Sequence, residues 1–199
     1  GYPGVLRAAT VAHSRSLVER LRAAGLRAEH LDGETPLAQR DEIFARLAVG
    51  GERNGCPAGV DVLCQVDVAS EGWNPPSDYD RYLRLKHLHG PRIYPYAPIC
   101  VLSDCRPTLS SCGYMQFLGR GCRQSGDTIQ TLQGPMPALP KPWFRYLDHS
   151  RNWERHGTLR EHWGFSLTDG EPKGRAPRDK RGLLTARYCP KCLPAVLAT

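Results

Sequence analysis

Residues 116–123 combine polar side chains at helical spacing with two glycines. Gln116, Arg120 and Arg123 stand at positions i, i+4 and i+7, which fall on one face of a helix. Each glycine costs a helix about 1 kcal/mol relative to alanine, so close approach of a ligand or of neighbouring backbone must favour them. Paired guanidiniums can meet the charge that develops on a γ-phosphate. A surface helix with exposed arginines is the simpler alternative.

Three hydroxyl side chains, Ser14, Thr35 and Ser70, stand at loop ends after apolar runs or at helix starts. Hydroxyls and amides at such places can hold phosphates without reading base sequence. Their commoner use is as helix caps or turn residues, and Thr35 can serve both purposes. The net charge of +7 suits a polyanionic partner. A solvated basic surface explains that charge equally well.

The elements that must position these residues follow from the order of apolar runs. Short apolar runs alternate with amphipathic stretches in the first half of the chain, which predicts βαβ units and a parallel sheet. Strands are expected at residues 6–12, 27–31, 60–65 and 99–103, and helices at residues 16–24, 35–50 and 110–122. Four prolines in residues 134–142 predict a break in regular structure.

Residues 77–98 are rich in arginine, tyrosine, histidine and proline, and we interpret them as an insertion on the rim of the domain. Their basic and tyrosine side chains can neutralise a phosphate backbone and stack on bases, although a solvated basic loop is as good an interpretation. The residues concerned are Arg81, Arg84, Lys86, His87 and Arg92, with Tyr82, Tyr94 and Tyr96.

The eight cysteines favour reduced thiols over a disulfide framework, because the N-terminus has none of the features of a secretory signal. Cys189 and Cys192 have the spacing of half a zinc ribbon. The other half is missing, and His156 or His162 would complete a site only by an unusual route. We therefore expect an incomplete zinc ribbon, which has only two of the four ligands, and assign no metal ligand. No stretch approaches the roughly 18 apolar residues of a membrane span, so a cytoplasmic protein is expected.

Four segments together resemble a known family. Gln116-x-x-Gly119-Arg120-x-x-Arg123 resembles motif VI of superfamily 2 (DEAD/DEAH-type) nucleic-acid helicases, position for position. Residues 10–16 resemble motif IV, residues 31–40 the signature that follows it, and residues 66–76 motif V. Four motifs in the right order are far more specific than any one of them. Residues 147–157 resemble a stretch found in phage-type and bacterial members.

The resemblance implies a RecA-like helicase C-terminal domain over residues 1–133, with residues 77–98 as the insertion. Residues 134–199 would form an irregular C-terminal extension with a partial, zinc-ribbon-like end. In the family this domain packs against an N-terminal RecA-like domain, with ATP between the two and a single strand of DNA or RNA across both. The resemblance thus implies the second motor domain of an ATP-dependent helicase.

Site roles are carried over by matching position. The resemblance implies that Arg123 is the arginine finger, Arg120 a second phosphate contact and Gln116 part of the same network. It places four residues at the nucleotide edge: Glu71, Gly72, Asn74 and Gly119. Asn74 departs from the usual aspartate, which keeps a hydrogen-bond acceptor for a ribose hydroxyl but removes the charge.

The sequence contains neither a G-x-x-x-x-G-K-[ST] phosphate loop nor an Asp-Glu-x-His or Asp-Glu-Ala-Asp metal motif. We therefore expect ATP and Mg²⁺ to be held mainly by another domain, and the abrupt start in a strand favours a fragment. One alternative is a translocase subunit of a restriction or repair complex, which uses the same motor without strand separation. Another is a nucleic-acid-binding module without catalysis.

Overall fold

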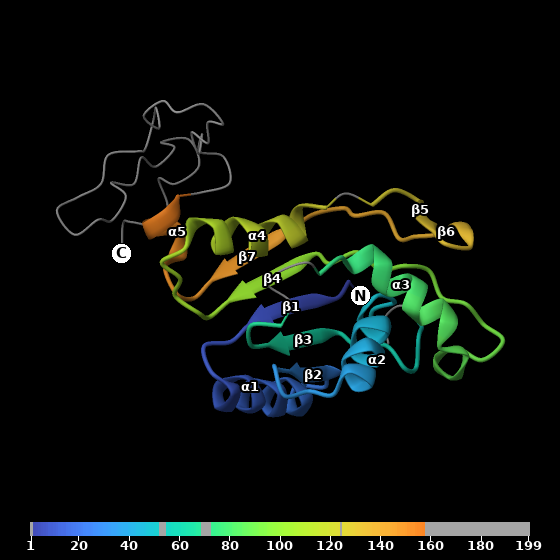
Figure 1. Ribbon diagram of the computed structural model, residues 1–199, viewed down its shortest axis with the longest axis horizontal. Coiled ribbons are helices and arrows are strands. Elements are labelled where there is room, and N and C mark those ends of the chain that lie inside the picture. Colours follow the sequence, from blue (N-terminus) through green and yellow to red (C-terminus); the bar gives the residue numbers. More distant parts are fainter. Residues whose placement is uncertain (1, 52–54, 69–72, 124, 158–199) are drawn as a thin grey trace. The chain divides into compact units, whose positions relative to one another are not determined.

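The structure is a computed structural model that describes residues 2–51, 55–68, 73–123 and 125–157 (Figure 1). The chain divides into two compact units, Gly1–Ser150 and Arg151–Thr199. In the second unit one short helix is described, α5 (Asn152–His156). The first unit contains every described strand and the remaining described helices.

Five parallel strands form the central sheet of the first unit, in the order β2-β3-β1-β4-β7. Their bounds are β1 (Gly4–Arg7), β2 (Ala28–Leu31), β3 (Val62–Gln65), β4 (Val101–Asp104) and β7 (Arg145–Asp148). All four strand pairs are parallel. The predicted α/β class with a parallel sheet is therefore confirmed.

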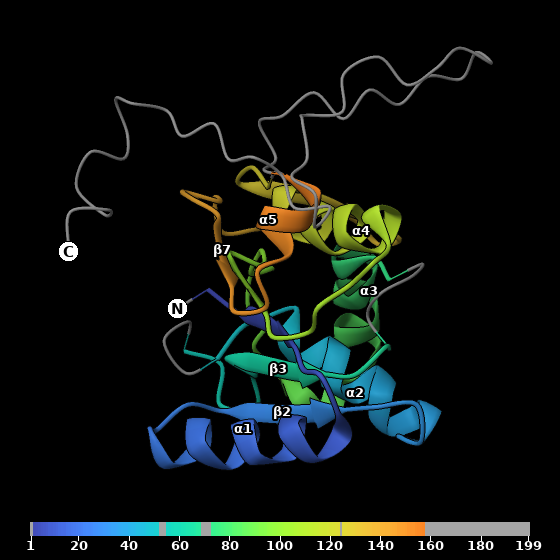
Figure 2. The same ribbon diagram turned by 90° about the vertical axis from the view of Figure 1, so that its left-hand side faces the viewer.

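Each connection between strands of the central sheet that follow one another along the chain carries a helix. α1 (Val11–Ala23) leads from β1 to β2, and α2 (Leu37–Leu47) leads from β2 to β3. α3 (Pro75–Arg84) and the short η2 (Lys86–Leu88) precede β4, and α4 (Ser111–Cys122) precedes β7. Because only the first connection runs toward the β2 edge, right-handed crossovers place α1 on one face and the other helices opposite. Figure 2 shows α2, α3 and α4 on one side of the sheet and α1 beside β2.

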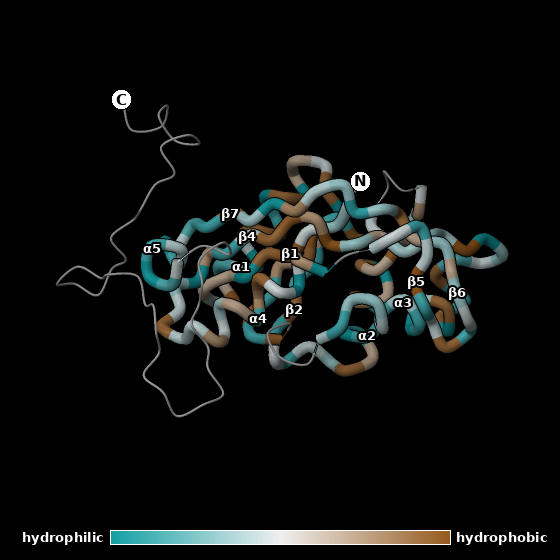
Figure 3. Tube along the Cα trace, turned by 90° about the horizontal axis from the view of Figure 1, so that it is seen from above, coloured by the Kyte–Doolittle hydropathy of each residue, from teal (hydrophilic) through white to brown (hydrophobic). Residues whose placement is uncertain are grey.

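The main apolar core lies between the sheet and the helices α2 and α4. Val5, Leu63 and Leu102 from three neighbouring strands pack there with Phe44 and Phe117 from these helices. Figure 3 shows the hydrophobic colour gathered around β1 and β4, which are the central strands. Strands of a parallel sheet that are covered on both faces are expected to be apolar runs of this kind.

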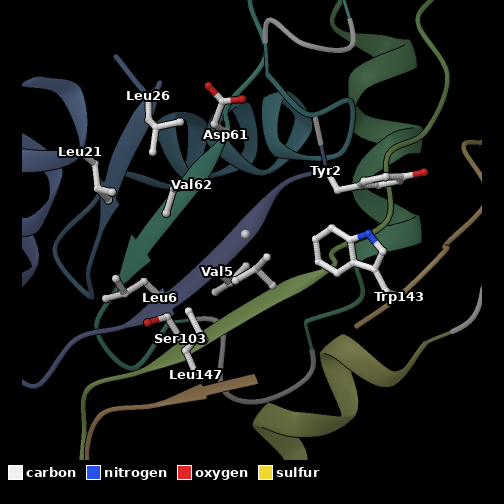
Figure 4. Close-up of a pocket in the computed structure, with 12 residues that line it drawn as sticks. Tyr2, Val5, Leu6, Leu21, Leu26, Asp61, Val62, Ser103, Trp143 and Leu147 are labelled. Carbon is white, nitrogen blue, oxygen red and sulfur yellow. The ribbon is translucent and has the colours of Figure 1, made fainter. Parts of the chain in front are cut away.

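The opposite face is covered only in part, because α1 packs on β2 and β3. The remainder is hollowed into a pocket of about 490 Å³ (Figure 4). Leu6, Val62 and Leu147 line its floor, and the rings of Tyr2 and Trp143 meet edge to face at one end, with centroids 6.0 Å apart. This pocket is mainly apolar and lies away from the predicted site on α4.

A buried ion pair joins the ends of the two central strands. The guanidinium of Arg7 donates to both carboxylate oxygens of Asp104, and the Arg7 Nε to Asp104 Oδ1 distance is 2.9 Å. Arg7 also lies over the ring of Phe117, 4.6 Å from its centroid. The Tyr146 hydroxyl lies 3.1 Å from Asp104 Oδ2. These contacts attach β1, β4, α4 and β7 to one another beneath the carboxyl edge of the sheet.

The tyrosines of residues 77–98 correct one interpretation of that segment. Tyr82, Tyr94 and Tyr96 are buried in a second apolar cluster with Tyr79. Tyr79 donates its hydroxyl to the carbonyl of Tyr94, 2.6 Å away, and the Tyr82 hydroxyl accepts from the Tyr94 amide. The prediction that these rings stack on bases is therefore wrong, because the rings are packed inside the protein. The charged residues Arg84, Lys86, His87 and Arg92 are exposed.

The predicted break in regular structure holds for residues 139–142 but not for residues 134–137, and the first compact unit continues past residue 133. β6 (Gly134–Pro137) pairs with β5 (Thr128–Thr131) in an antiparallel hairpin, and β7 joins the central sheet. Prolines are tolerated in an edge strand because it has unpaired positions. The first unit extends to Ser150. Residues 158–199, with His162, Cys189 and Cys192, lie outside the described residues.

Candidate functional site

Helix α4 presents two faces of different character. Ser110 caps its start by accepting from the Gly113 amide at 3.0 Å, which satisfies one of the free amides of the first turn. The buried face carries Tyr114, Phe117, Leu118 and Gly121. The predicted polar stripe lies on the other face, where Gln116 and Gly119 are exposed and Arg120 is half-buried, and the exposed Arg123 follows as the C-cap.

Both arginines of the stripe reach the segment that joins β3 to α3. Arg120 donates from its guanidinium to the carbonyl oxygen of Trp73, and Arg123 donates to the side-chain oxygen of Asn74. Residues from the two predicted motifs, V and VI, thus meet in space although 47 and 49 positions separate the bonded pairs. Gln116 lies on the same helix face. The predicted residues Ser70, Glu71 and Gly72 lie outside the described residues.

Trp73 is held firmly beneath these contacts. It is 6% exposed, and its ring stacks on Phe44 of α2 with centroids 5.3 Å apart. Its indole Nε1 donates to Asp78 Oδ2 over 2.5 Å. Asn74 follows as the N-cap of α3, with Pro75 at the first helical position, where a missing amide hydrogen is harmless. The Asn74 side chain makes no capping bond and reaches Arg123 instead.

The charges of this cluster favour an anionic ligand. The printed acceptors of the two guanidiniums, Trp73 O and Asn74 Oδ1, are both neutral oxygens. Burial, and next the nearby cation of Arg123, lower the pKa of Arg120 below its ordinary value. A mobile anion placed between the two arginines would relieve this repulsion. The geometry therefore suits a phosphate-bearing ligand.

The two glycines of α4 have different surroundings. A Cβ on Gly121 would lie 1.9 Å from the Phe144 ring, whereas a Cβ on Gly119 would meet nothing within 4 Å. The close approach inferred at Gly121 is therefore to a packed aromatic side chain. Gly119 lies on the exposed stripe with room around it.

Ser14 is buried, and its hydroxyl is bonded inside the fold. It is 0% exposed, and its hydroxyl lies 2.8 Å from His30 Nδ1. His30 Nε2 in turn lies 2.8 Å from Asp32 Oδ2. The order serine–histidine–aspartate is that of a nucleophile relay, but the buried serine leaves no space for a substrate at its oxygen. Direct contact of Ser14 with a strand does not fit this burial.

Thr35 serves as a turn residue in the described geometry. Its hydroxyl donates to Asp32 Oδ1 over 3.0 Å and accepts from the Asp32 amide over 3.1 Å, and its own amide also donates to Asp32 Oδ1. The hydrogen bond from His30, with those from Thr35 and Glu34, holds the pKa of Asp32 at about 2. The turn interpretation of Thr35 therefore fits its contacts.

Sequence reasoning missed His30, Asp32 and Asp78. A signal for the first two exists, because a histidine and an aspartate two positions apart at a strand end point to the same side. Among the described residues no group of three or more histidine, cysteine or acidic side chains is placed to hold a metal ion. Within the same residues, no helix is long and apolar enough to span a membrane.

No protein-family model matches the chain. A protein of a Lactococcus phage (isolate 7-9), described as a 51.5 kDa protein, is 25% identical to it over 194 residues. The match covers 96% of this chain and 32% of the phage protein, so the chain spans about a third of that relative's length. Among solved structures, the C-terminal domain of the DEAD-box protein Dbp5 is similar with a TM-score of 0.46 and 16% identity, over 76% of this chain and 63% of that one.

Proposed function

We propose that the chain is the second, C-terminal motor domain of an ATP-driven nucleic-acid helicase of superfamily 2. It supplies the arginine side of an ATP site and half of a strand-binding groove. One observation carries this proposal. Arg120 and Arg123 of α4 contact the consecutive residues Trp73 and Asn74, so the segments that resemble motifs V and VI form one cluster.

The donor set of this cluster fits a nucleotide. Arg123, as the arginine finger, and Arg120 would contact the phosphates. Gln116 would take part in the same network from the same helix face. Asn74, with Gly119, Glu71 and Gly72, would border the nucleotide. The side-chain oxygen of Asn74 can accept a hydrogen bond from a ribose hydroxyl. ATP supplies the γ-phosphoryl group whose hydrolysis drives the motor. A separate N-terminal domain with a phosphate loop would hold most of ATP and Mg²⁺.

Strand binding in this proposal is electrostatic and independent of base sequence. Ser14 and Thr35 use their hydroxyls inside the fold, so the support comes from the net charge of +7 and from exposed cations. Arg84, Lys86 and Arg92 are exposed after the buried tyrosines of α3. Cations of this kind neutralise backbone phosphates and release counterions, which gives affinity without base readout.

The affinity of the chain for a fluorescent single strand is expected to fall steeply as salt rises. The Arg84→Gln/Arg92→Gln variant should lower the slope of log affinity against log salt by about 1.4, since each lost phosphate contact removes about 0.7. The matched control Arg20→Gln/Arg145→Gln removes the same charge from other exposed positions. Fluorescence anisotropy across a salt series measures both. A salt-independent signal, or no binding at low salt, rejects the proposed groove.

A further inference from the structure

We propose that Asp78 is a positioning residue for the arginine cluster, acting through the indole of Trp73. It holds the Trp73–Asn74 segment in the place where Arg120 and Arg123 contact it. That the cluster faces a nucleotide rests on the proposed function, whereas the contacts themselves do not.

Asp78 connects the segment before α3 to the helices around it. It lies in the first turn of α3 and is 1% exposed. One carboxylate oxygen accepts from the Trp73 indole, and the other accepts from the guanidinium of Arg81. The Nε of Arg81 lies 3.2 Å from Asp41 on α2. The Asp78 carboxylate thus links Trp73, just before α3, to α3 itself and, through Arg81, to α2.

Trp73 and the next residue, Asn74, connect Asp78 to the two arginines. The Trp73 ring is held by its stack on Phe44 and by the bond to Asp78, so its orientation is fixed from two sides. The backbone carbonyl of this same residue accepts from Arg120, and the next side chain accepts from Arg123. A buried indole without an acceptor would be left unsatisfied, which favours movement of the segment toward water. Movement of this segment displaces both acceptors of the arginine pair.

Residue 78 is a carboxylic acid, which can gain or lose a proton. A buried asparagine amide could accept the indole hydrogen bond as well as a carboxylate does. What distinguishes the aspartate is that its charge, and so the strength of this hydrogen bond, depends on pH. Burial raises the pKa of Asp78 to about 6, against the lowering effects of Trp73 and Arg81. Asp41 of α2 raises it further. Burial, and next the charge of Asp78, raise the pKa of the Tyr96 phenol, while Arg123 lowers it. The charge of Asp78 therefore changes close to neutral pH.

The sign of the coupling follows from this shift. The pKa in the folded chain lies above the ordinary 3.8, so the folded state holds the proton more tightly. The contribution of Asp78 to stability is therefore largest below about pH 4 and falls as pH rises toward 6. Through the upper part of this range the carboxylate gains its charge and strengthens its bonds to Trp73 and Arg81. The arginine cluster should respond over the same range.

The test is nuclear magnetic resonance of the full 199-residue chain between pH 4.5 and 8. The signal of the Trp73 indole is assigned with Trp73→Phe, and the Nε signals of Arg120 and Arg123 with single lysine variants. All three signals should shift with a common midpoint near 6, the pKa of Asp78. In Asp78→Asn, which keeps the shape and an acceptor, these shifts should vanish. Signal shifts with pH that persist in this variant come from groups other than Asp78.

Asp80→Asn is the matched control, because Asp80 lies on the same helix and accepts instead from the Leu132 amide. It should leave the three titrations unchanged. Arginine signals that titrate equally in wild type and Asp78→Asn, or an indole signal that does not titrate, would overturn the positioning role. A residue that only filled the core would not move the arginine signals with pH. The test uses neither ATP nor a strand, so its failure leaves the proposed function standing, and the reverse also holds.

Discussion

Replacing Arg123 with alanine is expected to lower kcat for ATP hydrolysis by about 10³ or more in a longer protein that joins this chain to the proposed phosphate-loop domain. Nucleotide affinity should change little, because a finger stabilises charge that develops only in the transition state. Arg123 is exposed at the end of α4 and its described partner is the neutral Asn74 oxygen, so it can turn toward a phosphate. The Arg123→Lys variant should restore little of the lost activity, since the point charge of an ammonium group does not reproduce the planar guanidinium.

Single-turnover hydrolysis and nucleotide binding, measured side by side for Arg123→Ala and Arg120→Ala, test this expectation. Arg20→Ala on α1 is the control for loss of an exposed arginine. If Arg120→Ala is slow while Arg123→Ala hydrolyses ATP at the wild-type rate, the finger has been assigned to the wrong arginine. If both variants are near wild type, the interpretation of residues 116–123 as motif VI fails.

Replacing Gly121 with alanine is expected to destabilise the chain by about 1–3 kcal/mol, as overpacking of a closed site does. The added methyl would lie 1.9 Å from one carbon of the Phe144 ring and 2.4 Å from the next, so the ring or α4 must move. Phe144 packs against the main core just before β7, which limits how far it can shift. The loss should appear as a lower urea midpoint with an unchanged m-value.

Gly119→Ala is the matched control on the same helix. A methyl at this position meets nothing within 4 Å, so the variant should gain about 0.5–1 kcal/mol from lower backbone entropy in the unfolded chain. Equal stability losses in the two variants would contradict the packing account of Gly121. If Gly119→Ala is stable but loses nucleotide binding in the longer protein, the exposed stripe approaches its ligand at Gly119.

The fold was predictable because the core strands are short apolar runs between helix signals. The main errors lay at the start of α1 and at the last strand of the central sheet. Residues 6–12 look like one strand, but Thr10 accepts from the His13 amide and starts α1 at Val11. β7 was missed because its sequence Arg-Tyr-Leu-Asp alternates polar and apolar residues, which does not resemble a buried parallel strand.

The candidate site was predictable only in part. The spacing of residues 116–123 predicts the polar stripe of α4, since helical periodicity is a local property. Its contact with Asn74 came from the family resemblance, because no local rule pairs positions 49 residues apart. Asp78 was missed because residues 77–98 were interpreted as an insertion on the rim of the domain, whereas the structure buries Asp78 in the first turn of α3.

The central claim is that this chain completes an ATP site whose phosphate loop lies in another domain. Steady-state phosphate release tests it most directly, with the purified chain and the longer protein compared at saturating ATP and single strand. We expect no release above background from the chain alone and strand-stimulated release from the longer protein. Turnover by the purified chain alone, abolished by Arg123→Ala in that same chain, would contradict the claim.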